Sequence, residues 1–299
     1  MSDLAHLPTE ARNPASEHLD ELPTFDMLQV IHQGDQEAVA AVERELPHIA
    51  AAVEAIATRI QNGGRLFYTG AGTSGRLGVL DASECPPTYN TPSELVQGLI
   101  AGGDHALRNS IERAEDDPEQ GALDLVDHGF TGKDVLVGIA ASGRTPYVLG
   151  AIEHARGLGA LTIGLSCVPG SPIAQAAELA ITPATGPEVV TGSTRMKAGT
   201  ATKLVLNMLS TATLVRLGYV YGNLMVNVQP TNVKLQDRAA RIIASITGLD
   251  SAQAGELLSQ AGSVKTAVVM HQRGLSRADA EARLGTAHGR LREALGQSR

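Results

Sequence analysis

Apolar residues first show a regular spacing after Pro23, where they recur every three or four positions. This period predicts a long helix, capped by Asp35 and running to about Asn62. Pro47 lies inside the predicted helix and should kink or split it, because proline has no amide hydrogen for the helical ladder. Gly63-Gly64 follows and should end it.

Five short apolar runs come next, separated by helical stretches. The runs are typical of buried strands and lie at Leu66–Thr69, Leu95–Ile100, Val135–Ala140, Leu161–Ser166 and Leu179–Thr182. Between them, helical patterns lie near 76–84, 105–115, 146–158 and 171–177. Strands and helices that alternate at this spacing indicate a parallel, doubly wound sheet. We therefore expect an α/β fold with helices on both faces of a parallel sheet.

The remainder of the chain has only helical patterns. One long helix should cover about Met196–Leu217, and shorter ones follow at Ala239–Thr247, Ala252–Ala261, Val264–His271 and Arg277–Leu284. Asp250-Ser251 and Ser276 are typical helix caps. We predict three parts: an N-terminal arm and helix over 1–53, a catalytic domain over 54–218, and a small C-terminal helical domain over 219–299.

Composition narrows the choice of partner. The net charge is −8, and only 3% of residues are aromatic, with no Trp. A nucleic-acid binder needs a basic face or stacking platforms, so we expect no nucleic-acid partner. The most apolar stretch, Ala201–Val220, is interrupted by Lys203 and Arg216, which predicts no membrane span. Met1–Asp20 is polar and acidic rather than apolar like a signal peptide, so we expect a cytoplasmic protein.

A glycine-rich segment, Gly70-Ala71-Gly72-Thr73-Ser74-Gly75, follows the first predicted strand and opens a helix. Its letters match the G-x-G-x-x-G pattern of dinucleotide-binding folds, which is one interpretation. Two features count against it. Thr73-Ser74 supplies more hydroxyl groups than a pyrophosphate turn needs, and the next strand runs into Ala101-Gly102-Gly103 before it reaches an acidic residue.

An internal echo favours a different interpretation. Ser74-Gly75-Arg76 and Ser142-Gly143-Arg144-Thr145 each lie between a strand and a helix, 68 residues apart. The free amides of a helix N-terminus attract anions, serine adds a donor, and glycine allows close approach. A third loop, Thr191-Gly192-Ser193-Thr194, precedes the long helix.

Hydroxyl residues before helices can also be ordinary N-caps. Three such loops favour an anion site, because the carboxyl ends of parallel strands meet at one edge of the sheet. Arg195 and Lys197 could bind the anion there or merely solvate a helix start. The predicted ligand-binding residues are Gly72, Thr73, Ser74, Gly75, Ser142, Gly143, Arg144, Thr145, Ser193, Thr194 and Lys197.

Two glutamates are candidates for proton transfer. Glu84 ends the helix that the first loop begins, and its neighbours Cys85 and Pro86 could desolvate it and raise its pKa towards that of a general acid. Glu115 ends the following helix. Taken alone, either could be a solvated carboxylate at a helix end. The nine His residues show no metal-binding spacing, and we expect neither metal nor cofactor.

Taken together, these segments resemble the N-acetylmuramic acid 6-phosphate etherases, a family built on the sugar isomerase (SIS) fold. The resemblance runs through nearly the whole chain. It is carried by Arg12–Ser16, Gly70–Gly78, Asp81–Thr88, Ala114–Asp117, Gly138–Tyr147, Gly186–Thr200 and Leu204–Ser210. The phosphosugar loops alone would indicate only the superfamily, whereas Leu80–Thr88 and Gly186–Thr200 are specific to the etherases.

The resemblance implies that the chain cleaves the D-lactyl ether of N-acetylmuramic acid (MurNAc) 6-phosphate, giving N-acetylglucosamine (GlcNAc) 6-phosphate and D-lactate in peptidoglycan recycling. It implies Glu84 as the proton donor and Glu115 as a second acid/base. It also implies a cytoplasmic homodimer, which we expect to share its active site. The Arg12–Ser16 arm could reach a neighbouring subunit.

Three alternatives remain on sequence grounds. A sugar-phosphate isomerase on the same fold would also need a glutamate near C1 and C2. A non-catalytic phosphosugar sensor, similar to the glucokinase regulatory proteins, would not need both Glu84 and Glu115. A DNA-bound sensor would need a basic reading head, but the helical arm at 24–62 is acidic.

Overall fold

The computed structural model describes residues 8–229 and 232–297. The chain divides into two compact units. One comprises the residues up to Ser83 together with Ser93–Ser210, and the other comprises Glu84–Pro92 and the chain from Thr211 onward. The predicted borders at 53/54 and 218/219 describe functional parts of the chain, whereas the two units are defined by compactness alone. These borders therefore remain predictions.

The N-terminal helical segment is split, as Pro47 predicted. Helix α1 spans Thr24–Arg44 and helix α2 spans Leu46–Gln61, with Pro47 in the first turn of α2, where its missing amide costs nothing. The predicted start was wrong: α1 begins directly after Pro23, and Asp35 lies inside it. The helix continues on both sides of Asp35, so this residue does not cap a helix start. Two 3-10 turns, η2 (Pro14–Ser16) and η3 (Leu19–Glu21), precede α1.

The predicted parallel sheet is confirmed. Its five strands are β1 (Leu66–Gly70), β2 (Val96–Ile100), β3 (Val135–Ile139), β4 (Leu161–Leu165) and β5 (Leu179–Ile181). They lie in the order β2-β1-β3-β4-β5, with every pair parallel. The order reverses between β1 and β3, so their carboxyl ends flank the switch point at which such sheets bind ligands.

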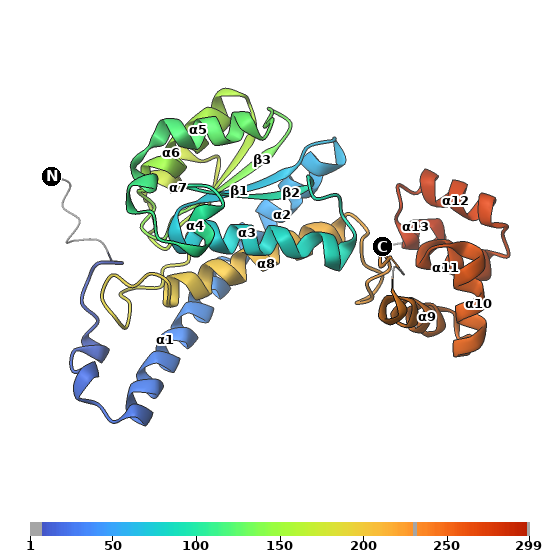
Figure 1. The fold of residues 1–299 in the computed structure, drawn as a ribbon, viewed down its shortest axis with the longest axis horizontal. Coiled ribbons are helices and arrows are strands. Elements are labelled where there is room, and N and C mark those ends of the chain that lie inside the picture. The colour runs from blue at the N-terminus through green and yellow to red at the C-terminus, as the bar shows by residue number, and fades with distance from the viewer. Residues whose placement is uncertain (1–7, 230–231, 298–299) are drawn as a thin grey trace. The chain divides into compact units, whose positions relative to one another are not determined.

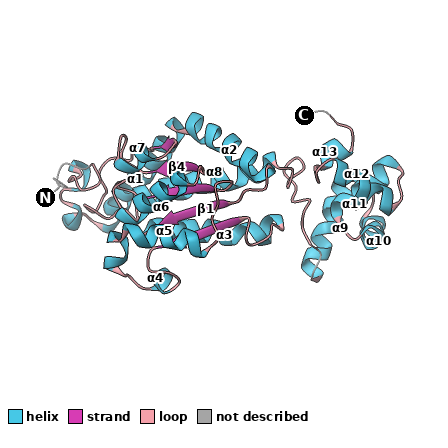
Figure 2. Cartoon of the chain, turned by 90° about the horizontal axis from the view of Figure 1, so that it is seen from above, coloured by secondary structure: helices cyan, strands magenta, loops and turns pink. Residues whose placement is uncertain are grey.

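Helices cover both faces of the sheet (Figures 1 and 2). Side chains alternate along β1, so that Phe67 joins an apolar cluster with α5 (Pro118–Asp127), α6 (Pro146–Gly157) and α7 (Pro172–Ala176). Tyr68 points to the other face. There it contacts α3 (Gly72–Tyr89), which lies beside α8 (Lys197–Arg216). None of the described helices has the length and apolarity that a bilayer crossing requires.

Two predicted helices differ in extent, and one helix was not predicted. The segment predicted at 105–115 is broken into α4 (His105–Arg108) and the 3-10 helix η4 (Glu112–Asp116). The prediction of 76–84 was too short, because α3 continues through Pro86-Pro87 to Tyr89. These prolines lie near its end, where missing amides matter less. Helix α5 was not predicted, although Asp117 caps it and Pro118 occupies its first position.

The C-terminal unit has its own apolar core. It contains α9 (Val233–Thr247), α10 (Ser251–Ala261), α11 (Val264–Arg273), α12 (Arg277–Thr286) and the short α13 (Leu291–Ala294). The predicted caps Asp250 and Ser276 both accept a hydrogen bond from the third amide of their helix. Buried residues from all five helices pack together. The predicted all-helical character of this part is confirmed.

One prediction concerns the packing of α3 on β2. A Cβ on Gly98 would lie only 2.5 Å from Val79 Cα and 2.7 Å from Val79 N, so Gly98→Ala must push the helix off the strand. We expect a loss of about 1–3 kcal/mol of stability. Thermal unfolding measures it. The control Gly157→Ala, whose Cβ would meet nothing within 4 Å, should not lower the unfolding midpoint. Equal midpoints for both variants would contradict this account.

Candidate active site

The two Ser-Gly loops start side by side at the switch point. Gly70, the last residue of β1, pairs with Ile139, the last residue of β3. Neighbouring strands are about 4.8 Å apart, so both loops leave the sheet at one place. The Gly70–Gly75 loop opens α3, and the Ser142–Thr145 loop opens α6.

Tight backbone packing shapes the first loop. A Cβ on Gly75 would lie 2.5 Å from the carbonyl oxygen of Gly70 and 2.6 Å from Ile100 Cγ1. Gly72, at the start of the helix, has a φ of +52°, which favours glycine. The first turn of α3 is therefore pressed against the strand end, with its amides at the edge of the sheet.

The second loop is built in a similar way. Gly143 has a φ of +69°, and a Cβ there would lie 2.2 Å from Ser171 Oγ. Its carbonyl oxygen accepts a hydrogen bond from the amide of Ile173 at 3.0 Å. Thr145 is the N-cap residue of α6, but its side chain makes no capping hydrogen bond, so capping does not account for this hydroxyl group. Arg144 Nε is buried and has no hydrogen-bond partner within the described chain.

The third loop differs, because an internal carboxylate occupies the helix start. Glu188 is buried, and its oxygens accept hydrogen bonds from the amides of Lys197 and Ala198, both at 2.9 Å. Glu188 therefore satisfies the first two amides of α8. Sequence analysis missed Glu188, although an acidic residue shortly before a hydroxyl-rich helix start is a recognisable signal.

Lys197 is also engaged within the chain. Its side chain is 3% exposed, and Nζ donates to Glu37 Oε2 on α1 at 2.7 Å and to the carbonyl oxygen of Pro187 at 3.1 Å. In this arrangement Lys197 joins α1 to α8. Its predicted role in ligand binding remains a prediction, without support from these contacts.

The beginning of the first loop does meet the third. A Cβ on Gly199 would lie 3.6 Å from Thr73 Cγ2 and 3.6 Å from the carbonyl oxygen of Thr194. Thr73 therefore lies against the first turn of α8. Ser193 and Thr194 are half-buried in this region, and Arg195 is exposed.

Glu115 lies at a small cavity beside the first loop. The cavity has a volume of about 140 Å³ and is lined by Ala71, Gly72, Arg76, Ala101, Ala106, Ser110, Ile111 and Glu115. Glu115 lines this cavity and is an exposed residue. Desolvation by the chain around it, with a smaller contribution from the negative charge of Asp116, raises the pKa of Glu115. A raised pKa suits a carboxyl group that exchanges protons near neutral pH.

Arg76 shapes this cavity instead of binding an anion. Its guanidinium donates to the carbonyl oxygens of Ala106 at 2.7 Å, Leu107 at 3.1 Å and Asn109 at 3.2 Å. These carbonyls lie at the end of α4, where a helix lacks internal donors. Arg76 thereby holds the chain that leads into η4 and Glu115. The arginines of the two echoing segments consequently differ in their surroundings.

Glu84 is not among the residues that line the Glu115 cavity. It lies on α3, and its side chain is exposed, not desolvated as its neighbours Cys85 and Pro86 suggested. Cys85 itself is buried, so the chain turns that side inward and the glutamate outward. The structure thus brings Gly72 and Glu115 to one cavity, but not Glu84.

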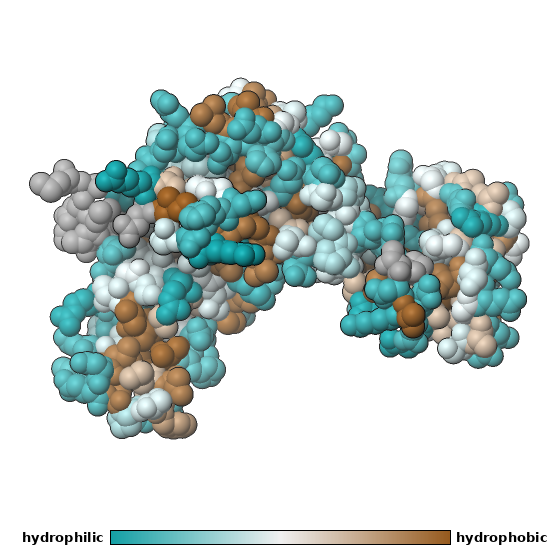
Figure 3. All heavy atoms as spheres, viewed as in Figure 1, coloured by the Kyte–Doolittle hydropathy of each residue, from teal (hydrophilic) through white to brown (hydrophobic). Residues whose placement is uncertain are grey.

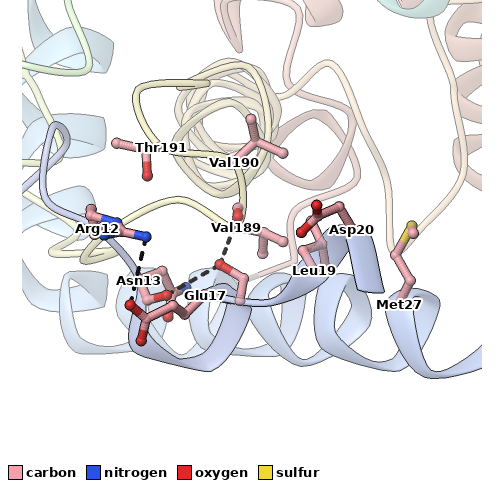
Figure 4. A pocket seen from close by; sticks show the side chains of 10 residues that line it. Arg12, Asn13, Glu17, Leu19, Asp20, Met27, Val189, Val190 and Thr191 are labelled. Atoms are coloured by element: carbon pink, nitrogen blue, oxygen red, sulfur yellow. Dashed lines mark hydrogen bonds and ion pairs between the residues drawn. The ribbon is translucent and has the colours of Figure 1, made fainter. Parts of the chain in front are cut away.

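The N-terminal arm lies on the third loop of its own chain. Ser16 Oγ donates to the carbonyl oxygen of Val189 at 2.7 Å, and Asn13 Nδ2 donates to that of Pro187 at 3.4 Å. Residues of the arm and Val189–Thr191 together line a cavity of about 430 Å³ (Figure 4). The Arg12–Ser16 segment therefore lies beside the stretch that leads into the third loop.

No group of three His, Cys, Asp or Glu side chains within the described residues could hold a metal ion. The chemistry that this edge of the sheet offers consists of backbone amides, hydroxyl groups and carboxyl groups. Such groups can bind a phosphate and transfer protons.

Family models match two overlapping parts of the chain. The model of the glucokinase regulatory protein N-terminal SIS domain matches residues 48–156, and the SIS domain model matches residues 115–212. A solved structure of a Bacteroides fragilis capsule-formation protein, described as a candidate phosphosugar isomerase, is 20% identical with a TM-score of 0.50. It covers 66% of this chain and 94% of that one, and it supports the fold alone.

Closer relatives match the chain from end to end. A protein of Aliivibrio fischeri strain ES114, named N-acetylmuramic acid 6-phosphate etherase, is 57% identical over 98% of both chains. A protein of the same name from Rhizobium rhizogenes strain K84 is 56% identical and covers 99% of this chain and 96% of its own.

The raised pKa of Glu115 leads to a prediction. Asp116→Asn removes a like charge, so the pKa of Glu115 should fall, yet it should stay above the ordinary value because burial is the larger cause. Carbon-13 NMR titration of the carboxyl groups measures this. Glu119→Gln, an exposed change in the first turn of α5, is the control. An unchanged Glu115 pKa in Asp116→Asn would contradict the account.

Proposed function

Because the chain belongs to the N-acetylmuramic acid 6-phosphate etherase family, we propose that it cleaves the D-lactyl ether of MurNAc 6-phosphate and releases D-lactate and GlcNAc 6-phosphate. It is a carbon–oxygen lyase, and its substrate is a sugar phosphate. The single observation that carries the mechanism is that Glu115, whose pKa is raised, lines the same cavity as Gly72 of the first loop.

The reaction divides into an elimination and an addition. In the open-chain aldehyde the C2 proton is acidic, because it is α to the carbonyl. A base removes it, the C3–O bond breaks, and the departing lactate oxygen takes a proton. Water then adds its oxygen to C3 while C2 regains a proton. Two carboxyl groups in different surroundings can carry all of these proton transfers.

The loops at the switch point supply a phosphate cradle. The first turn of α3 presents amides at the strand edge, and Ser74 and Ser142 add hydroxyl groups, with Gly75 and Gly143 keeping the backbone close. The positive end of a helix favours a dianionic phosphate. Arg144, whose Nε has no partner in the described chain, could donate to the same ligand. We assign the phosphate to these two loops.

In our proposal Glu84 protonates the departing lactate and Glu115 activates the water that adds at C3. The surroundings of Glu115 support its part, since its raised pKa lets the group accept and return a proton. Glu84 has the exposed position of a group that another surface must cover before it can act.

The spacing of residues along α3 supports a contribution from a second subunit. Gly72 lines the Glu115 cavity, and Glu84 lies twelve residues further along the same helix, roughly 18 Å away along its axis. An acid and a base that act on adjacent carbons must each approach to about 3 Å. We therefore propose a homodimer in which Glu84 of one protomer acts on the sugar held beside Glu115 of the partner subunit.

An exposed apolar residue next to Glu84 supports this arrangement. Leu80 precedes Glu84 by one helical turn on the same face of α3, and it is 53% exposed. A second copy that covered this face would bury Leu80 and desolvate Glu84 together. The proposal also places the enzyme in the cytoplasm, where the thiols of Cys85 and Cys167 stay reduced.

The assigned roles can be tested with two variants. Glu84→Gln should lose release of D-lactate, because the leaving oxygen has no proton donor. Glu115→Gln should keep part of the exchange of the C2 proton, since water addition comes after that step. D-Lactate is measured by an enzyme-coupled assay, and exchange by NMR in deuterium oxide. Glu119→Gln is the control, and equal loss of both signals in both variants would refute the division of roles.

The shared site can be tested by mixing the two variants and measuring GlcNAc 6-phosphate, the product that requires both the elimination and the addition of water. Subunits exchanged at equal concentration give about half heterodimers, each with one intact site of two, so activity should return to about a quarter of wild type. This follows because one interface site of the heterodimer combines both native glutamates. No recovery after proven subunit exchange would show that both glutamates come from one chain.

A further inference from the structure

Asp81 lies one helical turn before Glu84 and is buried at 6% exposure. Its carboxylate accepts hydrogen bonds from three side chains on two other elements. Tyr68 Oη on β1 donates to Oδ2 at 2.9 Å, and on α8 Asn207 Nδ2 and Ser210 Oγ donate to Oδ1 at 2.6 and 3.2 Å. The carboxylate thus joins the sheet and α8 to α3.

The three donors hold α3 on two sides. Tyr68 fixes the helix against the sheet, and a Cβ on Gly78 would already lie 2.9 Å from Tyr68 Cβ, so the approach is close. Asn207 and Ser210 fix the same carboxylate from α8. Rotation of α3 about its axis would break both sets of hydrogen bonds at once. A buried carboxylate that loses its donors is costly, so this rotation is strongly resisted.

Residues three apart on a helix lie on neighbouring positions of its surface, so the direction of Asp81 determines that of Glu84. We propose that Asp81 is a positioning residue for etherase catalysis: its hydrogen bonds to Tyr68, Asn207 and Ser210 set the angle at which α3 presents Glu84. The inference rests on the proposed function, and it adds a residue that touches no substrate.

The position of Asp81 also separates two properties. The phosphate loops lie at the first turn of α3, and Asp81 follows Ser74 by seven residues, about 10 Å along the helix. Loss of the Asp81 contacts should therefore disturb proton donation by Glu84 more than binding of the phosphate. A residue that merely stabilised the fold would show no such selectivity.

The test compares turnover with binding. Asp81→Asn keeps only one acceptor oxygen and removes the negative charge, so either Tyr68 or the Asn207–Ser210 pair loses its acceptor and the remaining hydrogen bonds weaken, and α3 should shift. We expect kcat for D-lactate release to fall roughly ten- to hundredfold, as misplacement of a catalytic group does. The KM, and the Kd for GlcNAc 6-phosphate measured by calorimetry, should stay within about threefold of wild type.

A paired variant keeps the test sharp if Asp81→Asn folds poorly. In the double variant Asp81→Asn with Asn207→Asp, the new amide at position 81 donates to the new carboxylate at position 207. This hydrogen bond has the reverse direction of the native one, and it should recover much of the lost kcat. Ser83→Ala, an exposed change on the same helix, is the matched control and should leave kcat unchanged.

Three results would overturn the proposal: an unchanged kcat in folded Asp81→Asn, equal loss of kcat and of product binding, or no recovery in the paired variant. Wild-type protein that releases no D-lactate would instead refute the proposed function. The two failures are therefore distinguishable.

Discussion

The contact between the end of β1 and the first turn of α3 is the constraint on which the site depends. Gly70 and Gly75 approach so closely that a Cβ on Gly75 would lie 2.5 Å from the carbonyl oxygen of Gly70. This approach fixes where α3 begins, and the strand order places that point beside β3. The first compact unit contains α3 from Gly72 to Ser83, so this local packing contact sets where that part of the helix starts.

Sequence predicted those parts of the fold that local patterns determine. All five strands and the break at Pro47 followed from period and from proline chemistry, and the caps Asp250 and Ser276 were recognisable from residue type alone. Local patterns did not predict the break between α4 and η4. At this point Arg76 donates to the carbonyl oxygens of Ala106 and Asn109, which lie 30 and 33 residues later in the sequence.

The candidate site shows the same limit. Its glycine and serine loops could be located from sequence, since their chemistry is local. The surroundings of Lys197 could not be predicted from the sequence. Its side chain donates to Glu37, which lies 160 residues away, and its backbone amide donates to Glu188. Likewise, the letters around Glu84 could not reveal which side of α3 faces outward. Of the three hydroxyl loops, the third is followed by helix amides that already bind the carboxylate of Glu188, which is why our proposal assigns the phosphate to the two loops at the switch point.

Two helices cross the division between the compact units, α3 after Ser83 and α8 after Ser210. The second unit is consequently not an appendage that begins at one point in the sequence, since Glu84–Pro92 belongs to it as well. Recombination that exchanged only the C-terminal tail between relatives would give the end of α3 a foreign neighbour. An exchange that is meant to keep the second unit intact must therefore carry Glu84–Pro92 together with the tail from Thr211 onward.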